Sequence, residues 1–416
     1  MINVLIGPAS SGKTETLIAR VAEAVAGGRR GISLIVPSAP AAAVLRELLN
    51  ETTAGLSLQQ GSYASVTTFP TLYRAILDKS GADYHWLATV ERETVLRSVI
   101  KELAQAGKLR YFGETAEMPG LVNSLGEWIE ELWRSHITPE AFARIAVARS
   151  DKDRDIAQVF AGYVAALETL DAVDPESAGH AALSAIEKAS EPHRWVSLIA
   201  VDGFDFLTAT QVQLLSTLAA RGVEVIVSLT CDEARAIHYW QRPTVARLQA
   251  AGAGFTQFTT TPKDVIQVAA AALMSEQRAT ELIDSDSIHA DSQRGGIRIV
   301  SAPDRAAELR SAARAIKRLV IEDHIPLDEV ALVCRSLSVY AAHIERIFGE
   351  CAIPVTLDSS LQVAENPAVA ALRRLFALSG ESFKRRACVE AWRSPYFDWS
   401  EFGLDEEAVD LLDAIS

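Results

Sequence analysis

The sequence predicts an α/β fold in which parallel strands alternate with helices, and three observations support this prediction. Residues 2–6 and 31–37 are short apolar runs of strand length, and each leads into a segment with helical spacing. Residues 65–69 are rich in β-branched side chains, as strands often are. Further apolar runs at 195–201 and 223–229 flank another helical pattern. This alternation is typical of parallel sheets that are covered by helices on both faces.

Composition and length limit the possible classes of protein. A chain of 416 residues that is 49% hydrophobic predicts several folded domains. No apolar run approaches about 18 residues, so we expect no membrane span and a cytoplasmic location. The four cysteines are far apart and lack metal-ligand spacing, which predicts reduced thiols. The formal net charge of −14 argues against non-specific coating of nucleic acid by the whole surface, although a local basic channel is compatible with it.

The segment GPASSGKT at residues 7–14 carries the clearest chemical signal. It matches the GxxxxGK[ST] pattern and lies between a strand candidate and a helix candidate, which an accidental match would lack. The glycines let backbone N–H groups face a β-phosphate at a helix N-terminus. Lys13 is placed to reach the β- and γ-phosphates, and the Thr14 hydroxyl is placed to ligate Mg²⁺. We therefore predict that ATP and Mg²⁺ bind at Gly7, Ser10, Ser11, Gly12, Lys13 and Thr14.

A second candidate for the same site follows the apolar run 195–201. Asp202 ends this run, where a carboxylate is expected to hold Mg²⁺ beside Thr14, directly or through water. The alternative is an aspartate in an ordinary turn. Gly203 then occupies the position where many ATP-hydrolysing proteins of this class carry a glutamate that polarises water, and glycine has no general base. We predict slow or absent hydrolysis, with Asp205 as the one candidate substitute.

Residues 86–193 show helical spacing almost throughout, which predicts an all-helical insertion between the two sets of strands. Trp128 and Trp133 lie on an apolar stripe of this region, which favours core packing over stacking on nucleic-acid bases. After a polar, acidic stretch, strand candidates at 296–302 and 329–334 predict a second sheet.

Taken together, the chain resembles superfamily 1 helicases of the UvrD type and, more closely, the AddB family of bacterial AddAB helicase-nucleases. The resemblance covers essentially the whole chain, although the P-loop alone is generic. Its segments are GPASSGKT, LIVPS, VTTFPTLYRAIL, PGLVNSLGEWIEELW, VDGFDFLTATQVQLL, DRAAELRSAARAIKRLV, VALVCRSLSVYAAHIERIFGECAIPVTLD and WRSPYF.

This resemblance implies a P-loop NTPase fold with two RecA-like parallel-sheet domains and an all-helical insertion. The expected boundaries are 1–85 for the first half of the first RecA-like domain, 86–193 for the insertion, 194–280 for the second half of that domain, 281–293 for a linker, 294–360 for part of the second RecA-like domain, and 361–416 for the start of a second helical insertion.

The resemblance also implies a function, namely the processing of double-strand DNA ends for recombinational repair. It implies an AddA-like helicase-nuclease subunit as the partner and single-stranded or end-containing DNA as the ligand. Family members end in a nuclease domain with an iron–sulphur cluster whose motifs this sequence lacks, so we expect no nuclease activity from these residues. Two alternatives stay open: a P-loop small-molecule kinase or regulatory ATPase, and a degenerate scaffold whose nucleotide pocket serves assembly.

Two further groups of residues gain candidate roles from this resemblance. Arg335 follows the strand candidate 329–334, where a motif arginine of related helicases reaches the γ-phosphate, and a local ion pair is the alternative. Basic residues interleaved with aromatic ones near the end of the chain are candidate DNA contacts, with a solvated helix face as the alternative. These basic residues are Lys384, Arg385, Arg386 and Arg393.

Overall fold

The computed structural model of the chain has two compact units, Met1–Ile297 and Arg298–Ser416, which we call the first and second units. The residues it describes are 1–53, 64–81, 83–189, 195–232, 236–259, 299–357, 366–380, 382–403 and 406–414. The linker expected at 281–293 lies outside these described residues. No described helix is long and apolar enough to cross a membrane, and none of the four cysteines forms a disulfide.

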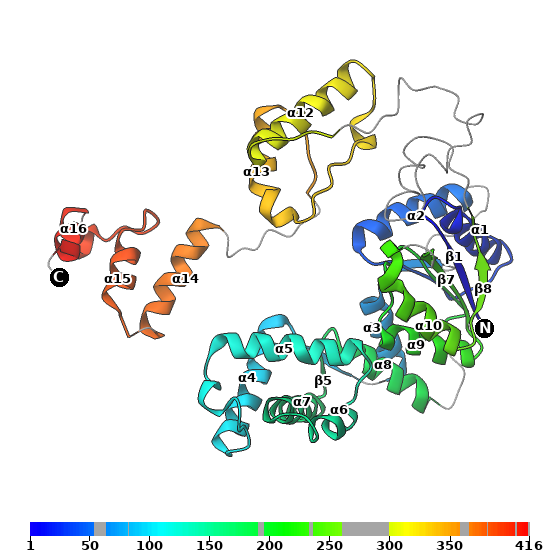
Figure 1. The fold of residues 1–416 in the computed structure, drawn as a ribbon, viewed down its shortest axis with the longest axis horizontal. Helices are drawn as coiled ribbons and strands as arrows, with labels where there is room; N and C mark the ends of the chain where they lie inside the picture. Colours follow the sequence, from blue (N-terminus) through cyan, green and yellow to red (C-terminus); the bar gives the residue numbers. More distant parts are fainter. Residues whose placement is uncertain are drawn as a thin grey trace. The chain divides into compact units, whose positions relative to one another are not determined.

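A six-stranded parallel sheet forms the centre of the first unit (Figure 1). The strand order is β3-β2-β6-β7-β1-β8, so that β1 is an inner strand between β7 and β8. Because all pairs are parallel, the carboxyl ends of these strands share one edge of the sheet. The strands are β1 (Ile2–Gly7), β2 (Ile32–Ile35), β3 (Ala64–Thr67), β6 (Leu198–Val201), β7 (Glu224–Thr230) and β8 (Gly254–Gln257).

Helices cover both faces of this sheet, which explains why the inner strands are apolar throughout. Side chains along a strand alternate between faces, and Leu5 packs with α1 and α2 while Val4 and Ile6 pack in the opposite core. The α/β fold with a parallel sheet is therefore confirmed. The helices are α1 (Lys13–Ala26) and α2 (Ala39–Thr53) on one face, and α3 (Phe69–Ser80), α8 (Ser177–Lys188), α9 (Ala209–Ala220) and α10 (Arg242–Ala250) on the other.

The helical insertion has a hydrophobic core of its own. Four helices build it, namely α4 (Thr89–Gln105), α5 (Pro119–Arg134), α6 (Pro139–Ala146) and α7 (Asp151–Thr169). Short parallel strands β4 (His85–Trp86) and β5 (Ala172–Val173) pair where the chain enters and leaves it. Helix α8 lies within the range expected for the insertion, yet its buried side chains belong to the core of the sheet.

The two tryptophans of α5 differ in their surroundings. Trp133 is 7% exposed and packs edge-on against Phe160, with ring centroids 5.1 Å apart, as predicted for a core residue. Trp128 is 46% exposed, so the prediction of core packing is wrong for this residue. The buried stripe of α5 is narrower than the apolar pattern of its sequence, and Trp128 lies at its margin beside exposed glutamates.

The second unit contains helices but, among its described residues, no paired strands. The strands expected at 296–302 and 329–334 are therefore not formed in the described part of this unit. A strand needs a hydrogen-bonded neighbour, and Val333 is 89% exposed. Its helices are α12 (Arg305–Ile321), α13 (Leu337–Glu350), α14 (Pro367–Gly380), α15 (Arg385–Trp392) and α16 (Glu406–Ala414), and short 3₁₀ turns occur in the two units at Gly113–Thr115, Ala236–Gln241, Leu327–Glu329 and Ser400–Phe402.

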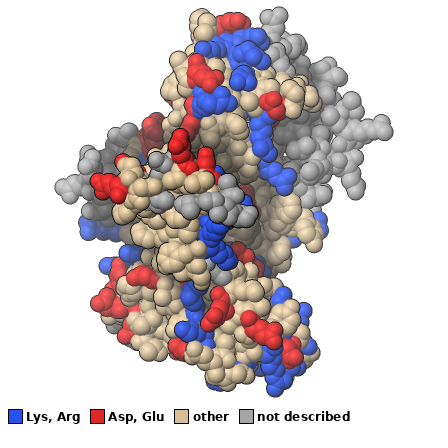
Figure 2. Space-filling model, turned by 90° about the vertical axis from the view of Figure 1, so that its left-hand side faces the viewer, with Lys and Arg blue, Asp and Glu red and all other residues tan. Residues whose placement is uncertain are grey.

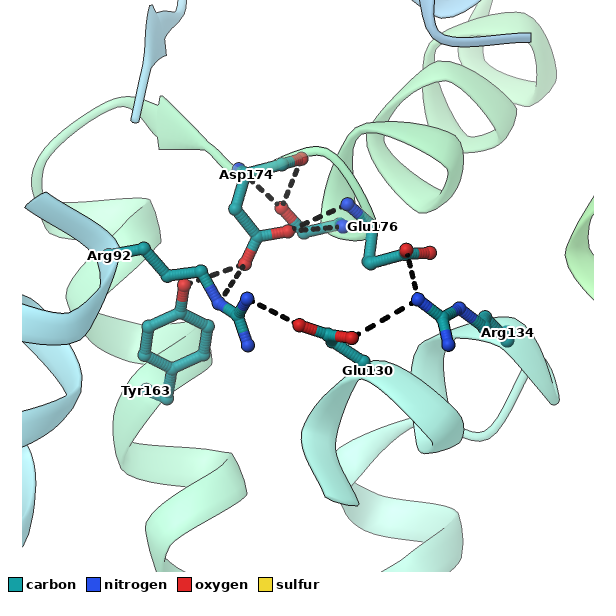
Figure 3. A network of polar contacts seen from close by, with 7 residues as sticks. Arg92, Glu130, Arg134, Tyr163, Asp174 and Glu176 are labelled. Carbon is teal, nitrogen blue, oxygen red and sulfur yellow. Dashed lines mark hydrogen bonds and ion pairs between the residues drawn. The ribbon is translucent and has the colours of Figure 1, made fainter. Parts of the chain in front are cut away.

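A network of polar side chains fixes the insertion to the start of α8 (Figure 3). Asp174 is 2% exposed, and its carboxylate accepts hydrogen bonds from the Tyr163 hydroxyl at 2.6 Å and from the backbone N–H of Ser177 at 2.7 Å. Arg92 on α4 lies 4.0 Å from the same carboxylate and forms an ion pair with Glu130 on α5. Because each buried charge has partners, the network holds the insertion without an unpaired charge.

Two histidines lie where the last turn of α5 meets α8. The His180 and His136 rings stack with centroids 4.7 Å apart, and the His180 ring lies 4.4 Å from the Trp133 ring. Burial lowers the pKa of His180 from 6.5 to about 4, and the neighbouring His136 lowers it further, while the Trp133 carbonyl opposes this shift. His180 is therefore neutral in the folded chain at pH 7.

This lowered pKa predicts a loss of stability in mild acid. The unfolded chain takes up a proton at His180 near pH 6.5, whereas the folded chain does so only near pH 4. The free energy of unfolding should therefore fall by on the order of 2 kcal/mol as the pH drops through this window. Urea unfolding at pH 7 and pH 5 measures the loss, and His180→Gln should reduce it. Equal pH dependence in the two proteins would contradict the assignment.

Candidate nucleotide-binding site

The loop between β1 and α1 has the backbone shape that its glycines predict. Ser10 and Gly12 adopt positive φ values of 56° and 84°, and Gly12 directly precedes the first turn of α1. A Cβ atom on Gly7 would lie 2.4 Å from the carbonyl oxygen of Phe258, so this position excludes a side chain. The loop therefore curls at the N-terminus of a helix, where backbone N–H groups favour an anion.

Lys13 lies over this loop and is only 5% exposed. Its Nζ donates hydrogen bonds to the Pro8 carbonyl oxygen at 2.5 Å and to the Ser11 Oγ at 3.1 Å. Desolvation lowers the pKa of Lys13, while the carboxylates of Asp202 and Glu15 oppose the shift. A buried ammonium held only by neutral acceptors and distant carboxylates favours the arrival of further negative charge.

Thr14 and Asp202, which are far apart in the sequence, meet at the carboxyl edge of the sheet. The Thr14 Oγ1 lies 3.2 Å from Oδ1 and 3.0 Å from Oδ2 of Asp202. Asp202 is 5% exposed, and its backbone N–H donates to the Ile35 carbonyl at 3.0 Å. A hydroxyl and a carboxylate are oxygen ligands that Mg²⁺ accepts, and Mg²⁺ commonly completes its shell with phosphates and water. No group of three His, Cys, Asp or Glu side chains suited to a metal occurs among the described residues.

Gly203 has a backbone conformation that disfavours a glutamate. Its φ is 80°, and a Cβ atom there would lie 3.4 Å from the Pro37 Cδ. The next residue, Phe204, packs edge-on against Phe69 with ring centroids 5.4 Å apart, and Asp205 is exposed. The turn after Asp202 is thus built for glycine, and no carboxylate occupies the position that follows the metal-ligand candidate.

We expect that Gly203→Glu lowers the free energy of unfolding by about 1–2 kcal/mol, because a side chain at positive φ is strained. We also expect no gain in ATP hydrolysis, since the strained backbone does not hold the new carboxylate in a defined place. Urea unfolding and phosphate release measure both effects. Gly120→Glu is the control, because a Cβ atom at Gly120 meets no atom within 4 Å. Fast hydrolysis by Gly203→Glu would contradict this interpretation.

The remaining predicted site residues lie in the second unit. Arg335 is exposed, and its role at a γ-phosphate stays a prediction. Lys384, Arg385, Arg386 and Arg393 are exposed, but Arg386 pairs with Glu390 at 3.1 Å and Arg393 with Asp410 at 2.6 Å. On the face that Figure 2 displays, Lys and Arg side chains are interspersed with Asp and Glu. A DNA-binding role for these residues also stays a prediction.

Sequence reasoning missed a pair of exposed aromatic residues near the nucleotide site. Tyr239 is 63% exposed and Trp240 is 65% exposed, and the Arg242 guanidinium lies 5.4 Å from the Tyr239 ring. The α10 helix that follows them is tied to the loop after β6, because the Thr244 Oγ1 lies 3.2 Å from the backbone N and 3.1 Å from the carbonyl O of Leu207. The run HYWQR, in which aromatic and basic residues alternate, is the signal that identifies them in the sequence.

Comparison with known proteins assigns the family. The family model described as "ADDB, N-terminal" matches residues 4–244. The chain belongs to this AddB family. It is 26% identical to an ATP-dependent helicase/deoxyribonuclease subunit of Moorella thermoacetica over 99% of this chain and 37% of that protein. Proteins of the same name from Desulforamulus reducens and Acetivibrio thermocellus are 24% and 22% identical, over 89% and 99% of this chain. The chain thus spans about one third of the length of these relatives, which it covers to 37%, 33% and 36%.

Proposed function

We propose that this chain is the nucleotide-binding, helicase-like part of a cytoplasmic AddB-type subunit that acts with an AddA-like subunit on DNA ends during recombinational repair. The observation that carries the nucleotide part is the meeting of Thr14 and Asp202 beside the buried ammonium of Lys13. Membership of the AddB family supports the DNA part. No observation favours the alternative of a small-molecule kinase or regulatory ATPase.

The chain's own residues bind and orient the nucleotide in this proposal. The Lys13 ammonium exchanges the Pro8 carbonyl and the Ser11 hydroxyl for oxygens of the β- and γ-phosphates. Thr14 and Asp202 hold the metal, which neutralises phosphate charge when it is bound. Backbone N–H groups of the loop and the N-terminus of α1 face the phosphates.

Hydrolysis is slow or absent in this proposal, because the residue after Asp202 is a glycine at positive φ and supplies no general base. Nucleotide binding therefore acts by favouring one conformation, whereas the AddA-like partner supplies the main motor. A contact from Arg335 to the γ-phosphate would add to this conformational preference.

Exposed residues of both units supply DNA contacts in this proposal. Tyr239 and Trp240 offer aromatic faces on which bases of a single strand stack. The basic residues 384–386 supply phosphate contacts, which add a salt-dependent contribution to affinity. The nuclease activity named in the relatives belongs to sequence outside these residues.

A DNA titration with the complete subunit and its partner tests the proposal. We expect binding of a duplex with a single-stranded end at low salt, with affinity that falls steeply as salt rises. Trp240→Ala should weaken binding to the single-stranded end about tenfold, since base stacking contributes about 1–3 kcal/mol. Tyr111→Ala, another exposed aromatic residue at 59% exposure, is the control. Absence of DNA affinity at low salt would refute the DNA part of the proposal.

A further inference from the structure

The segment that links the nucleotide site to α9 is held by hydrogen bonds along its length. Asp202 ends β6, and Leu207 then contacts the Thr244 Oγ1 with both its backbone N at 3.2 Å and its carbonyl O at 3.1 Å. Thr208 caps α9, and its Oγ1 accepts the backbone N–H of Gln211 at 3.2 Å. A displacement of Asp202 is thus transmitted to the first turn of α9, where Thr210 lies.

Thr210 joins this first turn to the helical insertion. Its Oγ1 donates a hydrogen bond to the carbonyl oxygen of Trp133, in the last turn of α5. The Nε2 of His180 on α8 lies 3.0 Å from the same carbonyl oxygen and 3.2 Å from the Thr210 Oγ1. Three helices therefore meet at one carbonyl group, which we call the Trp133 junction, formed by Trp133, His180 and Thr210.

The Trp133 junction is closely packed on the sheet side and anchored on the insertion side. Gly179 lets α8 approach α9, because a Cβ atom there would lie 3.1 Å from the Thr210 Cγ2 and 3.3 Å from the Tyr73 Cε2. The Trp133 indole lies in the core of the insertion against Phe160. One residue therefore belongs to the insertion through its side chain and to the sheet through its carbonyl group.

We propose that the Trp133 junction relays the nucleotide state of the P-loop site to the helical insertion. This inference rests on the proposed binding of a Mg-nucleotide between Thr14 and Asp202. The Thr14 hydroxyl now donates to the Asp202 carboxylate, and that hydrogen bond gives way when both oxygens turn to a cation. The end of β6 rearranges, the capped start of α9 follows it, and Thr210 moves the last turn of α5.

The insertion is built to respond as one body. Its core is separate from those of the sheet, and the paired strands β4 and β5 form its connection to the rest of the unit. A shift at the last turn of α5 therefore reorients the insertion instead of deforming it, because packed cores resist deformation. Thr210 and His180 are positioning residues in this relay.

Hydrogen exchange of backbone amides tests the relay in the complete chain, with and without Mg-ATP. The informative amides are those of residues 135–137, which include the His136 N–H bonded to the Trp133 carbonyl at 3.1 Å and the Ile137 N–H bonded to the Leu132 carbonyl at 2.9 Å. Thr210→Val removes the hydroxyl and keeps the shape, whereas Thr210→Ser keeps the hydroxyl. Ser216→Ala is the matched control, because it removes another hydroxyl of α9 that bonds within the helix to the Val212 carbonyl at 2.7 Å.

In the wild type, we expect Mg-ATP to change exchange at residues 135–137 by about threefold or more. Thr210→Val should lose this response while its nucleotide affinity stays within about threefold, and Thr210→Ser and Ser216→Ala should keep the response. An unchanged response in Thr210→Val, or no response in a wild type that binds nucleotide, would overturn the relay and leave the proposed nucleotide site intact. A wild type that binds no nucleotide would refute both.

Discussion

Replacing Lys13 with alanine should weaken the binding of Mg-ATP on the order of 100-fold. The ammonium is 5% exposed and already lies over the loop that is expected to hold the phosphates. Charge-assisted hydrogen bonds contribute about 1.5–3 kcal/mol each, and a loss of about 2.7 kcal/mol corresponds to that change in affinity. Isothermal titration calorimetry of the wild type and the variant measures it.

A second lysine provides the control for this experiment. Lys101 lies on α4 and is exposed, so Lys101→Ala removes the same charge from the surface of the insertion. Its nucleotide affinity should match that of the wild type. If Lys13→Ala and Lys101→Ala bind ATP equally well, the phosphate-binding role of the loop is wrong.

Replacing Asp155 with alanine should lower the free energy of unfolding by about 3–5 kcal/mol. Asp155 on α7 is 1% exposed. Its carboxylate accepts the backbone N–H groups of Arg110 at 3.1 Å, Tyr111 at 2.7 Å and Phe112 at 3.0 Å. Alanine leaves these donors without their acceptor in the interior of the insertion, and buried unsatisfied donors are costly.

Urea unfolding followed by circular dichroism measures this loss. Asp151→Ala on the same helix is the control, because the Asp151 side chain is 50% exposed and pairs only with Arg154 at 2.7 Å. Surface ion pairs contribute about 0–1 kcal/mol, so the control should stay within that range. Equal losses in the two variants would show that the three backbone contacts do not stabilise the insertion.

The inner strands and the site at their carboxyl ends were predictable because local sequence determines them. β1, β6 and β7 are buried on both faces, so they read as continuous apolar runs. The meeting of Thr14 with Asp202 follows from a motif and from the shared edge of a parallel sheet. The edge strand β8 was missed because its four residues are exposed and carry no apolar pattern.

Other features depend on contacts that a pattern does not contain. Apolar spacing places Trp128 on the stripe of α5, but the surrounding helices decide how much of that stripe is buried. The run 329–334 is as apolar as a buried strand, yet strand formation also needs a neighbouring strand. The Trp133 junction joins residues from three helices, and only the packing of those helices brings Thr210 to the Trp133 carbonyl.

Thr14 and Asp202 are expected to hold the metal of a bound nucleotide, and the proposed nucleotide site depends on this role. Calorimetric titration with ATP, in the presence and absence of Mg²⁺, tests it most directly when the wild type is compared with Asp202→Asn. We expect Mg²⁺ to raise the ATP affinity of the wild type about tenfold or more, and to have little effect on Asp202→Asn. Equal affinities with and without Mg²⁺ in the wild type, or an undiminished Mg²⁺ effect in Asp202→Asn, would contradict this role.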